Sequence, residues 1–513
     1  MSLYKTFSDK VATYAKQALD KMLDNGNKYG MNYINRIETL IKELNTGIYE
    51  KEQAIKLVLL AFISGKSCFL YGPPGTAKSL IARRVALAFI TQASNTDSNS
   101  DTSDKDSCSS NTESNTFFAY LMNRFSTPEE IFGPIDIAEL KQNRLTRNTQ
   151  GYLPTAHFAF LDEIWKSSPA ILNTLLTIIN EKIYRDGNSD IKVPLKGLVC
   201  ASNEFPAKNQ GLEALYDRLV IRLCVLPVER KESFEALLQA KNETKITISN
   251  PFSLNELEDI TKQAKQIIFS KEALQTIHSL RVLIDDHNKS LEKQMHAQNS
   301  QDSKKQNEIV KQSQGVDPDT LSGIYISDRR WSAMAELLRI AALLSDRKEV
   351  LPADVTLLSH CLWSDETQKK TICNLIAKAL KYSLQSNEES NDMQKIQNEY
   401  SALYHTALNE CYTNGYKQTK KMNEMIKGIF IEKCDSLIKS INSILARLNK
   451  NYHTTKKTMY NPFLDESDYK LVLQGIIKSI KEARQFHIAI EQLKHIITHQ
   501  PIPVPSQYNP EKN

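Results

Sequence analysis

A glycine-rich turn between a short apolar run and a helix-patterned segment constrains the fold of this chain most. The apolar run covers residues 68–71, and the positions that follow it are Gly72, Pro73, Pro74, Gly75, Thr76, Ala77, Lys78 and Ser79. A buried strand, such a turn and a helix N-terminus together hold the phosphates of a nucleotide, because free backbone N–H groups and the positive helix end face the oxygens. The pattern therefore predicts a nucleotide-binding α/β domain.

Two side chains of this loop have specific expected roles. Lys78 can reach the β- and γ-phosphates of ATP, and the Ser79 hydroxyl can be a ligand of Mg²⁺. Ala77 stands where the strict pattern has a second glycine. Because alanine adds only a Cβ, we still expect the loop to wrap around phosphate, and all eight positions are candidate ATP contacts.

A second apolar run, residues 158–161, ends in two acids, Asp162 and Glu163. We expect Asp162 to hold Mg²⁺, mostly through water, and Glu163 to polarise the attacking water. The alternative is a strand followed by a solvated acidic turn. Since both motifs occur in this order, each followed by a helix-patterned segment, together they favour an ATPase.

The composition is that of an ordinary soluble protein. The 513 residues carry a net charge of +5, which is too dilute to indicate a nucleic-acid binder. The eight cysteines form no C-x-x-C pair, and the ten histidines show no metal-ligand spacing. The N-terminus lacks a signal-peptide core and no apolar run reaches the ~20 residues of a membrane helix, so we expect a cytoplasmic protein without a transmembrane segment.

The order of apolar runs predicts how the chain is organised. Up to about residue 230, nearly all-apolar strands alternate with helices, which favours a parallel sheet covered on both faces. Helical periodicity dominates from there to about residue 498. Two polar stretches interrupt this order. Residues 91–115 are predicted to be a disordered surface insert, and 289–315 interrupt the later helical region.

Six ordered segments resemble the MoxR branch of the AAA+ ATPases, and within it the group called regulatory ATPase variant A. The likeness covers roughly residues 38–370, and its segments are 72–79, 124–134, 160–166, 201–204, 214–218 and 327–331. The resemblance implies an AAA+ αβα P-loop domain followed by an all-α lid. It also implies a homo-oligomer, a ring of six with ATP at each subunit boundary, that uses ATP and Mg²⁺.

The resemblance also implies three polar residues that act on the phosphates. Asn203 corresponds to sensor 1, beside Glu163; a turn asparagine that caps the next segment is the alternative. Arg218 corresponds to the arginine finger that reaches the neighbouring subunit's nucleotide, and a surface ion pair with Asp217 is its alternative. Arg329 corresponds to sensor 2, and the adjacent Arg330 is the alternative for this role.

Further family features map to three places. Tyr49, with Ile48, matches the position where the family wraps the adenine, although ordinary packing is the alternative. Residues 130–155 resemble the helix-2 insert. Residues 182–196 resemble the pre-sensor hairpin, in which Tyr184 and Arg185 are candidates for transmitting force; a plain surface hairpin is the alternative.

Together these observations divide the chain into four predicted domains. They are an N-terminal helical extension (1–37), the AAA+ nucleotide-binding domain (38–230), a helical lid domain (231–375) and a C-terminal helical domain (376–513). The last domain departs from the subgroup, whose better-known members carry a β-rich domain that docks a lysine decarboxylase. Helical spacing from Cys434 to Leu448 predicts helices there instead, so the decarboxylase partnership is not carried over.

These expectations lead to one preferred function and two alternatives. We expect an ATP-hydrolysing motor that remodels or matures a partner protein, in a chaperone-like way. The resemblance implies that it works with a separate von Willebrand factor A domain protein, and the lack of a metal-ion adhesion motif in the chain fits a separate partner. The sequence does not identify the client protein. The alternatives are a nucleotide-gated assembly scaffold with little turnover and, less favoured, a nucleic-acid-dependent AAA+ motor.

Overall fold

The computed structural model describes most of the chain. It covers residues 33–90, 116–187, 189–206, 211–239, 246–302, 323–384, 387–413, 418–419 and 422–498. Most of the predicted N-terminal extension and the predicted insert 91–115 lie outside these residues. The chain forms two compact units. The sheet unit comprises Met1–Ile268, Ser327–Glu349 and Asn461–Phe463, and the helical unit comprises Phe269–Ile326, Val350–Tyr460 and Leu464–Asn513.

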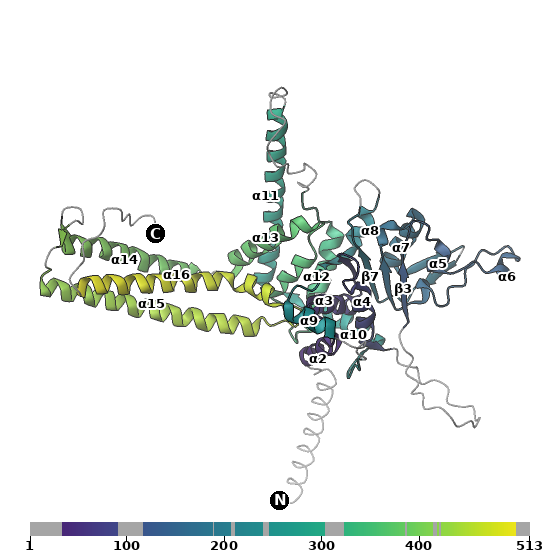
Figure 1. The fold of residues 1–513 in the computed structure, drawn as a ribbon, viewed down its shortest axis with the longest axis horizontal. Coiled ribbons are helices and arrows are strands. Elements are labelled where there is room, and N and C mark those ends of the chain that lie inside the picture. Colours follow the sequence, from purple (N-terminus) through teal and green to yellow (C-terminus); the bar gives the residue numbers. More distant parts are fainter. Residues whose placement is uncertain are drawn as a thin grey trace, which may run out of the picture. The chain divides into compact units, whose positions relative to one another are not determined.

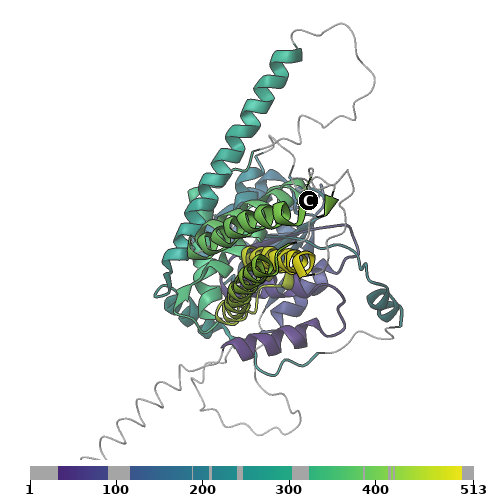
Figure 2. The same ribbon diagram turned by 90° about the vertical axis from the view of Figure 1, so that its left-hand side faces the viewer.

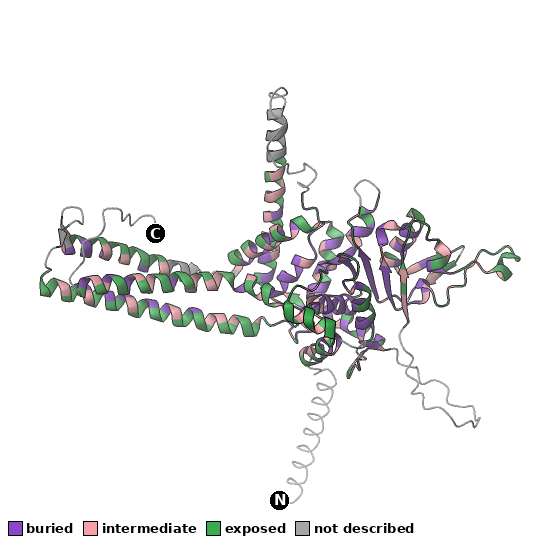
Figure 3. Ribbon diagram, viewed as in Figure 1, coloured by how far each residue is buried: buried purple, intermediate pink, exposed green. Residues whose placement is uncertain are grey.

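A five-stranded parallel sheet forms the centre of the sheet unit (Figure 1). Its order is β3-β4-β7-β1-β8, with bounds Phe117–Leu121, Phe158–Asp162, Gly197–Ser202, Ser67–Tyr71 and Leu219–Cys224. Figure 3 shows these strands mainly in the colour of buried residues, whereas the residues of the edge strand β3 are half-buried or exposed. Parallel strands are buried on both faces and therefore read as continuous apolar runs, which is why the sequence predicts them well.

Helices cover both faces of this sheet. Helices α3 (Glu52–Ile63) and α4 (Lys78–Ala86) pack on one face. Helix α7 (Pro169–Glu181) and the short α8 (Glu213–Arg218) pack on the other, around a core that includes Phe69, Leu161, Leu198 and Leu175. This αβα arrangement confirms the predicted fold class.

The remaining elements of the sheet unit are short or peripheral. They are α2 (Tyr33–Asn45), β2 (Phe89–Ile90), α5 (Pro128–Phe132), α6 (Ile137–Leu140), η1 (Leu153–Thr155), η2 (Ile164–Lys166), β5 (Ile183–Asp186), β6 (Ser189–Lys192), α9 (Lys231–Gln239), β9 (Phe252–Ser253), α10 (Leu254–Ala264) and α12 (Asp328–Leu343). Strands β10 (Ile268–Phe269) and β11 (Glu349–Val350) lie where the chain passes between units. Helix α10 begins with a capping box. The Ser253 hydroxyl accepts a hydrogen bond from the Glu256 N–H, and the Glu256 carboxylate accepts one from the Ser253 N–H.

The helical unit consists almost entirely of helices. They are α11 (Lys271–Asp302), η4 (Pro352–His360), α13 (Glu366–Leu384), α14 (Asn387–Cys411), α15 (Glu424–Thr458) and α16 (Glu466–Thr498), with a small antiparallel pair, β12 (Tyr412–Thr413) and β13 (Gln418–Thr419). Figures 1 and 2 show α14, α15 and α16 side by side, and their apolar faces form one buried cluster. The predicted C-terminal helices are therefore confirmed. Helix α11 also runs through residues 289–302, so the first half of the second polar stretch is helical.

No helix of the described residues is long and apolar enough to cross a membrane.

Candidate functional site

The sheet brings the predicted phosphate loop and the predicted acidic pair to one edge. Tyr71 at the end of β1 is in register with Ser202 at the end of β7, and Leu161 near the end of β4 is in register with Cys200. Since all three strands are parallel, Gly72, Glu163 and Asn203 leave the sheet at the same carboxyl edge. This edge is where ligands bind in open α/β sheets.

Lys78 lies inside the phosphate loop. Its side chain is buried, and Nζ donates to the carbonyl oxygens of Gly72 at 2.8 Å and Pro73 at 2.9 Å. Burial lowers the pKa of the Lys78 ammonium group, while the carboxylates of Asp162 and Glu163 oppose that shift. The cation is thus enclosed by the loop and faces the two acids, as a phosphate-binding lysine requires.

Backbone geometry explains two of the loop positions. A Cβ added at Gly72 would lie 2.2 Å from the carbonyl oxygen of Val225, so no larger residue fits there. Ala77, which directly precedes α4, has φ 68° and ψ 22°, in the left-handed region that favours glycine. The loop therefore keeps the glycine-type conformation at Ala77, and the alanine adopts it at a cost in strain.

The acidic pair forms a tight turn at the end of β4. Glu163 has φ 51°, another left-handed conformation, and its backbone N–H donates to Asp162 Oδ1 at 3.0 Å. Two donors share Glu163 Oε2: Lys166 Nζ at 3.2 Å and the Ser202 hydroxyl at 3.4 Å. Sequence reasoning gave neither donor a role. The i, i+3 spacing of Glu163 and Lys166 was the one available signal.

The oxygen donors here fit a magnesium ion held together with a nucleotide. The Ser79 hydroxyl is exposed beside the loop, and Asp162 is half-buried at the strand end. Among the described residues, no three His, Cys, Asp or Glu side chains form a metal cluster. Mg²⁺ is usually held through one or two protein oxygens, substrate phosphates and water, so a sparse donor set is the expected one.

Two other predicted residues lie near the same part of the sheet unit. Asn203 is exposed directly after β7. Tyr49 is half-buried, and its hydroxyl donates to the carbonyl of Ala236 in α9 at 3.4 Å, whereas Ile48 is buried.

Arg218 lies at the opposite, amino edge of the sheet. It directly precedes Leu219, which is in register with Ser67 at the start of β1. Gly72 follows Ser67 by five residues, which is about 16 Å along a strand at about 3.3 Å per residue. The Arg218 guanidinium contacts Asn180 Oδ1 at 2.7 Å and the carbonyl of Ala214. Arg218 is thus directed away from its own phosphate loop.

Arg329 lies near Arg218. Burial and the nearby charge of Arg329 lower the pKa of the Arg218 guanidinium, and Asp217 opposes this. The Ser327 hydroxyl, which caps α12, donates to Asp217 Oδ2 at 2.7 Å and so fixes the start of α12 against α8. Arg329 is exposed, whereas Arg330 is buried at 2% exposure.

The predicted hairpin is present, but one of its two proposed force-transmitting residues is not at the surface. Strands β5 and β6 pair antiparallel. Arg185 is exposed, whereas Tyr184 is only 4% exposed and stacks on Phe132 with ring centroids 5.3 Å apart. The interpretation of Tyr184 as a contact to a partner or pore is therefore wrong, because its face of this short strand belongs to the core.

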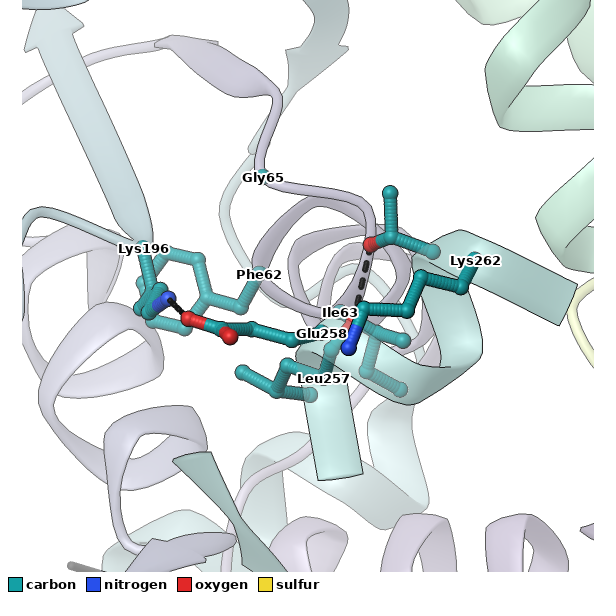
Figure 4. Close-up of a pocket in the computed structure, with 8 residues that line it drawn as sticks. Phe62, Ile63, Gly65, Lys196, Leu257, Glu258 and Lys262 are labelled. Atoms are coloured by element: carbon teal, nitrogen blue, oxygen red, sulfur yellow. Dashed lines mark hydrogen bonds and ion pairs between the residues drawn. The ribbon is translucent and has the colours of Figure 1, made fainter. Parts of the chain in front are cut away.

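A separate cavity of about 250 Å³ lies away from this edge (Figure 4). Phe62, Ile63 and Leu257 provide its apolar lining, and Lys196 and Glu258 form an ion pair of 3.0 Å at its side. Lys196 directly precedes β7, so the cavity is at the amino edge of the sheet. It is distinct from the candidate nucleotide site.

Comparison with known proteins finds two family models that match parts of this chain. Residues 35–96 and 106–263 match the family model of the MoxR domain in the MoxR-vWA-beta-propeller ternary systems, and residues 306–376 match an AAA lid domain. An uncharacterized protein of Methanocaldococcus jannaschii is 30% identical over 380 residues, 74% of this chain and 83% of that protein. A second from the same organism is 28% identical over 453 residues, 86% of this chain and 100% of that protein. A crystallised protein of Cytophaga hutchinsonii, named as a candidate ATPase, is 17% identical with a TM-score of 0.47, covering 70% of this chain and 98% of its own.

Proposed function

Because this chain belongs to the MoxR family of AAA+ ATPases, we propose that it hydrolyses ATP to ADP and phosphate at the boundary between its own copies. In this proposal the loop from Gly72 to Ser79 holds the phosphates, and Ser79 and Asp162 hold Mg²⁺. The metal would neutralise charge on the phosphates. Glu163 polarises the attacking water, and Asn203 orients it.

The position of Arg218 is the observation that supports hydrolysis between subunits. An arginine about one strand length from its own phosphate loop can stabilise transferring phosphate only on a nucleotide held by another copy. Arg329, which lies close enough to lower the pKa of Arg218, would join it on that neighbouring nucleotide. A head-to-tail contact of this kind closes into a ring when its rotation permits, and we propose a hexamer.

We further propose that the motion remodels a partner protein. The matched family model names MoxR together with vWA and β-propeller proteins, so a separate von Willebrand factor A domain protein is the proposed partner. The motifs at 124–134 and 160–166 support the regulatory ATPase variant A subgroup. We propose that the protein works in the cytoplasm, where thiols stay reduced; none of the seven cysteines in the described part of the chain is joined in a disulfide.

Steady-state ATP hydrolysis measured against protein concentration tests this proposal. The specific rate should rise with concentration in the wild type and collapse in Arg218→Ala and Glu163→Gln. Arg484→Ala, which removes an exposed arginine of α16, is the matched control and should keep the wild-type rate. Near-zero turnover with ATP bound and the assembly intact would favour the scaffold instead. Stimulation by DNA that added salt abolishes would favour the nucleic-acid motor.

A further inference from the structure

Three buried aromatic rings join the two edges of the sheet unit. They are Phe69 of β1, Trp165 of η2 and Tyr216 of α8, with exposed fractions of 0%, 9% and 6%. The ring centroids of Phe69 and Trp165 are 5.5 Å apart, those of Trp165 and Tyr216 5.7 Å, and those of Phe69 and Tyr216 5.5 Å. Each ring therefore contacts both others in a closed triangle, with tilted or edge-on geometries that aromatic pairs favour.

Each ring is close in sequence to a proposed functional residue. Phe69 precedes Gly72 by three residues, Trp165 follows Glu163 by two, and Tyr216 precedes Arg218 by two. Phe69 is held in the central strand β1. Trp165 and Tyr216, by contrast, lie on a three-residue 3-10 turn and on a six-residue helix. The triangle thus connects a central strand with the two short elements that carry or adjoin the proposed functional residues Glu163 and Arg218.

Helix α8 depends on this packing for its position. Besides Trp165 and Phe69, Tyr216 contacts Arg222 of β8. The guanidinium lies 3.6 Å from the Tyr216 ring centroid, and Nη2 donates to the Tyr216 carbonyl at 2.7 Å. Tyr216 is therefore one of the residues that hold α8 against the sheet, together with the buried Leu215. A change at its contact with Trp165 would reach Arg218 within one helical turn.

The indole of Trp165 carries a sign that it does more than fill space. Its Nε1 is buried and has no hydrogen-bond partner among the residues that the structure describes. Buried tryptophan N–H groups usually find an acceptor. A phenylalanine would fill this space without a buried donor, so packing alone does not explain a tryptophan at this position.

We propose that Trp165 is a positioning residue that couples the turn of Asp162 and Glu163 to helix α8. Through it, the state of a subunit's own nucleotide site sets the position of Arg218, which that subunit offers to the next one. The inference rests on the proposed trans action of Arg218. It adds the route by which one site in the assembly would affect its neighbour.

A double-mutant cycle on the full chain tests this coupling. Single-turnover hydrolysis of Mg–ATP is measured for Trp165→Leu, Arg218→Ala and the double variant, together with the Kd for ATP. If Trp165 acts through Arg218, Trp165→Leu lowers the hydrolysis rate about tenfold and changes the Kd for ATP less than twofold. The double variant is then no slower than Arg218→Ala alone. Phe158→Leu, an equally buried ring outside the triangle, is the control and should keep the rate.

The remaining outcomes of the cycle separate the coupling from the trans action of Arg218. Rate losses that multiply in the double variant would overturn the coupling while leaving the trans finger in place. A normal rate in Arg218→Ala alone would refute the trans finger, and this inference with it. If Trp165→Leu does not fold, Trp165→Phe serves in its place. The coupling then predicts the same non-additivity with a loss of about threefold, together with an unchanged or raised unfolding midpoint because the unpartnered N–H is gone.

Discussion

Ala77→Gly should stabilise this protein, although glycine substitutions usually do the opposite. A residue with a Cβ in the left-handed region bears about 1–2 kcal/mol of strain, and Ala77 has φ 68°. Glycine would remove this strain but would also gain about 0.4–1 kcal/mol of freedom in the unfolded chain. The difference predicts a net gain of about 0–1.6 kcal/mol in the free energy of unfolding, with a midpoint of about 0.8 kcal/mol.

The same substitution elsewhere in the sheet unit provides the control. Ala335 lies in the middle of α12 and is half-buried like Ala77, but it has helical backbone. Ala335→Gly should therefore lose about 1 kcal/mol. Urea unfolding followed by circular dichroism should move the midpoint in opposite directions for the two variants. If Ala77→Gly is destabilised as much as Ala335→Gly, the assignment of strain to the loop is wrong.

Three further predictions follow from charges around the sheet and in the helical unit. Lys166→Met should lower the rate of ATP hydrolysis about tenfold because the Glu163 carboxylate loses an orienting donor. Lys166→Arg, which keeps a donor, should restore the rate. An unchanged rate in Lys166→Met would show that the ion pair of Lys166 with Glu163 does not contribute to hydrolysis. Lys182 has no acidic partner among the described residues, and burial beside Lys66 and Lys196 lowers its pKa to about 8. Lys182→Met should thus raise the free energy of unfolding at pH 7 by roughly 1–3 kcal/mol. Calorimetry should show this difference between variant and wild type decreasing as the pH rises from 8 towards 10.5. Burial lowers the pKa of His360 from 6.5 to about 4, so the unfolded chain takes up a proton that the folded one does not. The helical unit should then lose up to about 3 kcal/mol as the pH falls from 6.5 to 4, and His360→Gln should remove most of that dependence in acid unfolding curves.

The sequence predicted those parts of the fold in which one stretch of chain determines its own environment. The strands of a parallel sheet are buried on both faces, so each is visible as an apolar run without knowledge of its neighbours. Because every such strand ends at the same edge, the residues after it, Gly72, Asp162 and Asn203, could be predicted to gather there. Helical spacing from Cys434 to Leu448 was equally visible, since it repeats over several turns.

Features that depend on contacts between distant segments could not be predicted in this way. In the four-residue strand β5, alternation does not reveal which face meets the core. The family resemblance alone made Tyr184 a candidate for transmitting force, with a plain surface hairpin as the alternative, and neither indicated that its ring is buried. The second donor to Glu163 Oε2, Ser202, is 39 residues away in sequence. The aromatic triangle combines three segments that lie far apart in sequence. No pattern in any one of these segments predicts its contact with the other two.

The two arginines at the amino edge show most clearly what the structure adds to the sequence. The resemblance left the choice of sensor 2 open between the adjacent Arg329 and Arg330. It could not show the contact of Asp217 with Ser327, which lie 110 residues apart in sequence. The contact between those two residues fixes the start of α12 beside Arg218, at the edge opposite the phosphate loop. Since Arg218 lies about a strand length from its own phosphate loop, with the charge of Arg329 nearby, we expect both arginines to act on a nucleotide held by a second copy of the chain. One chain would then carry two half-sites at opposite edges of its sheet, so the rate of ATP hydrolysis would depend on assembly. Subunits with Arg218→Ala or Arg329→Ala should both fail to activate a neighbouring subunit while still binding ATP themselves.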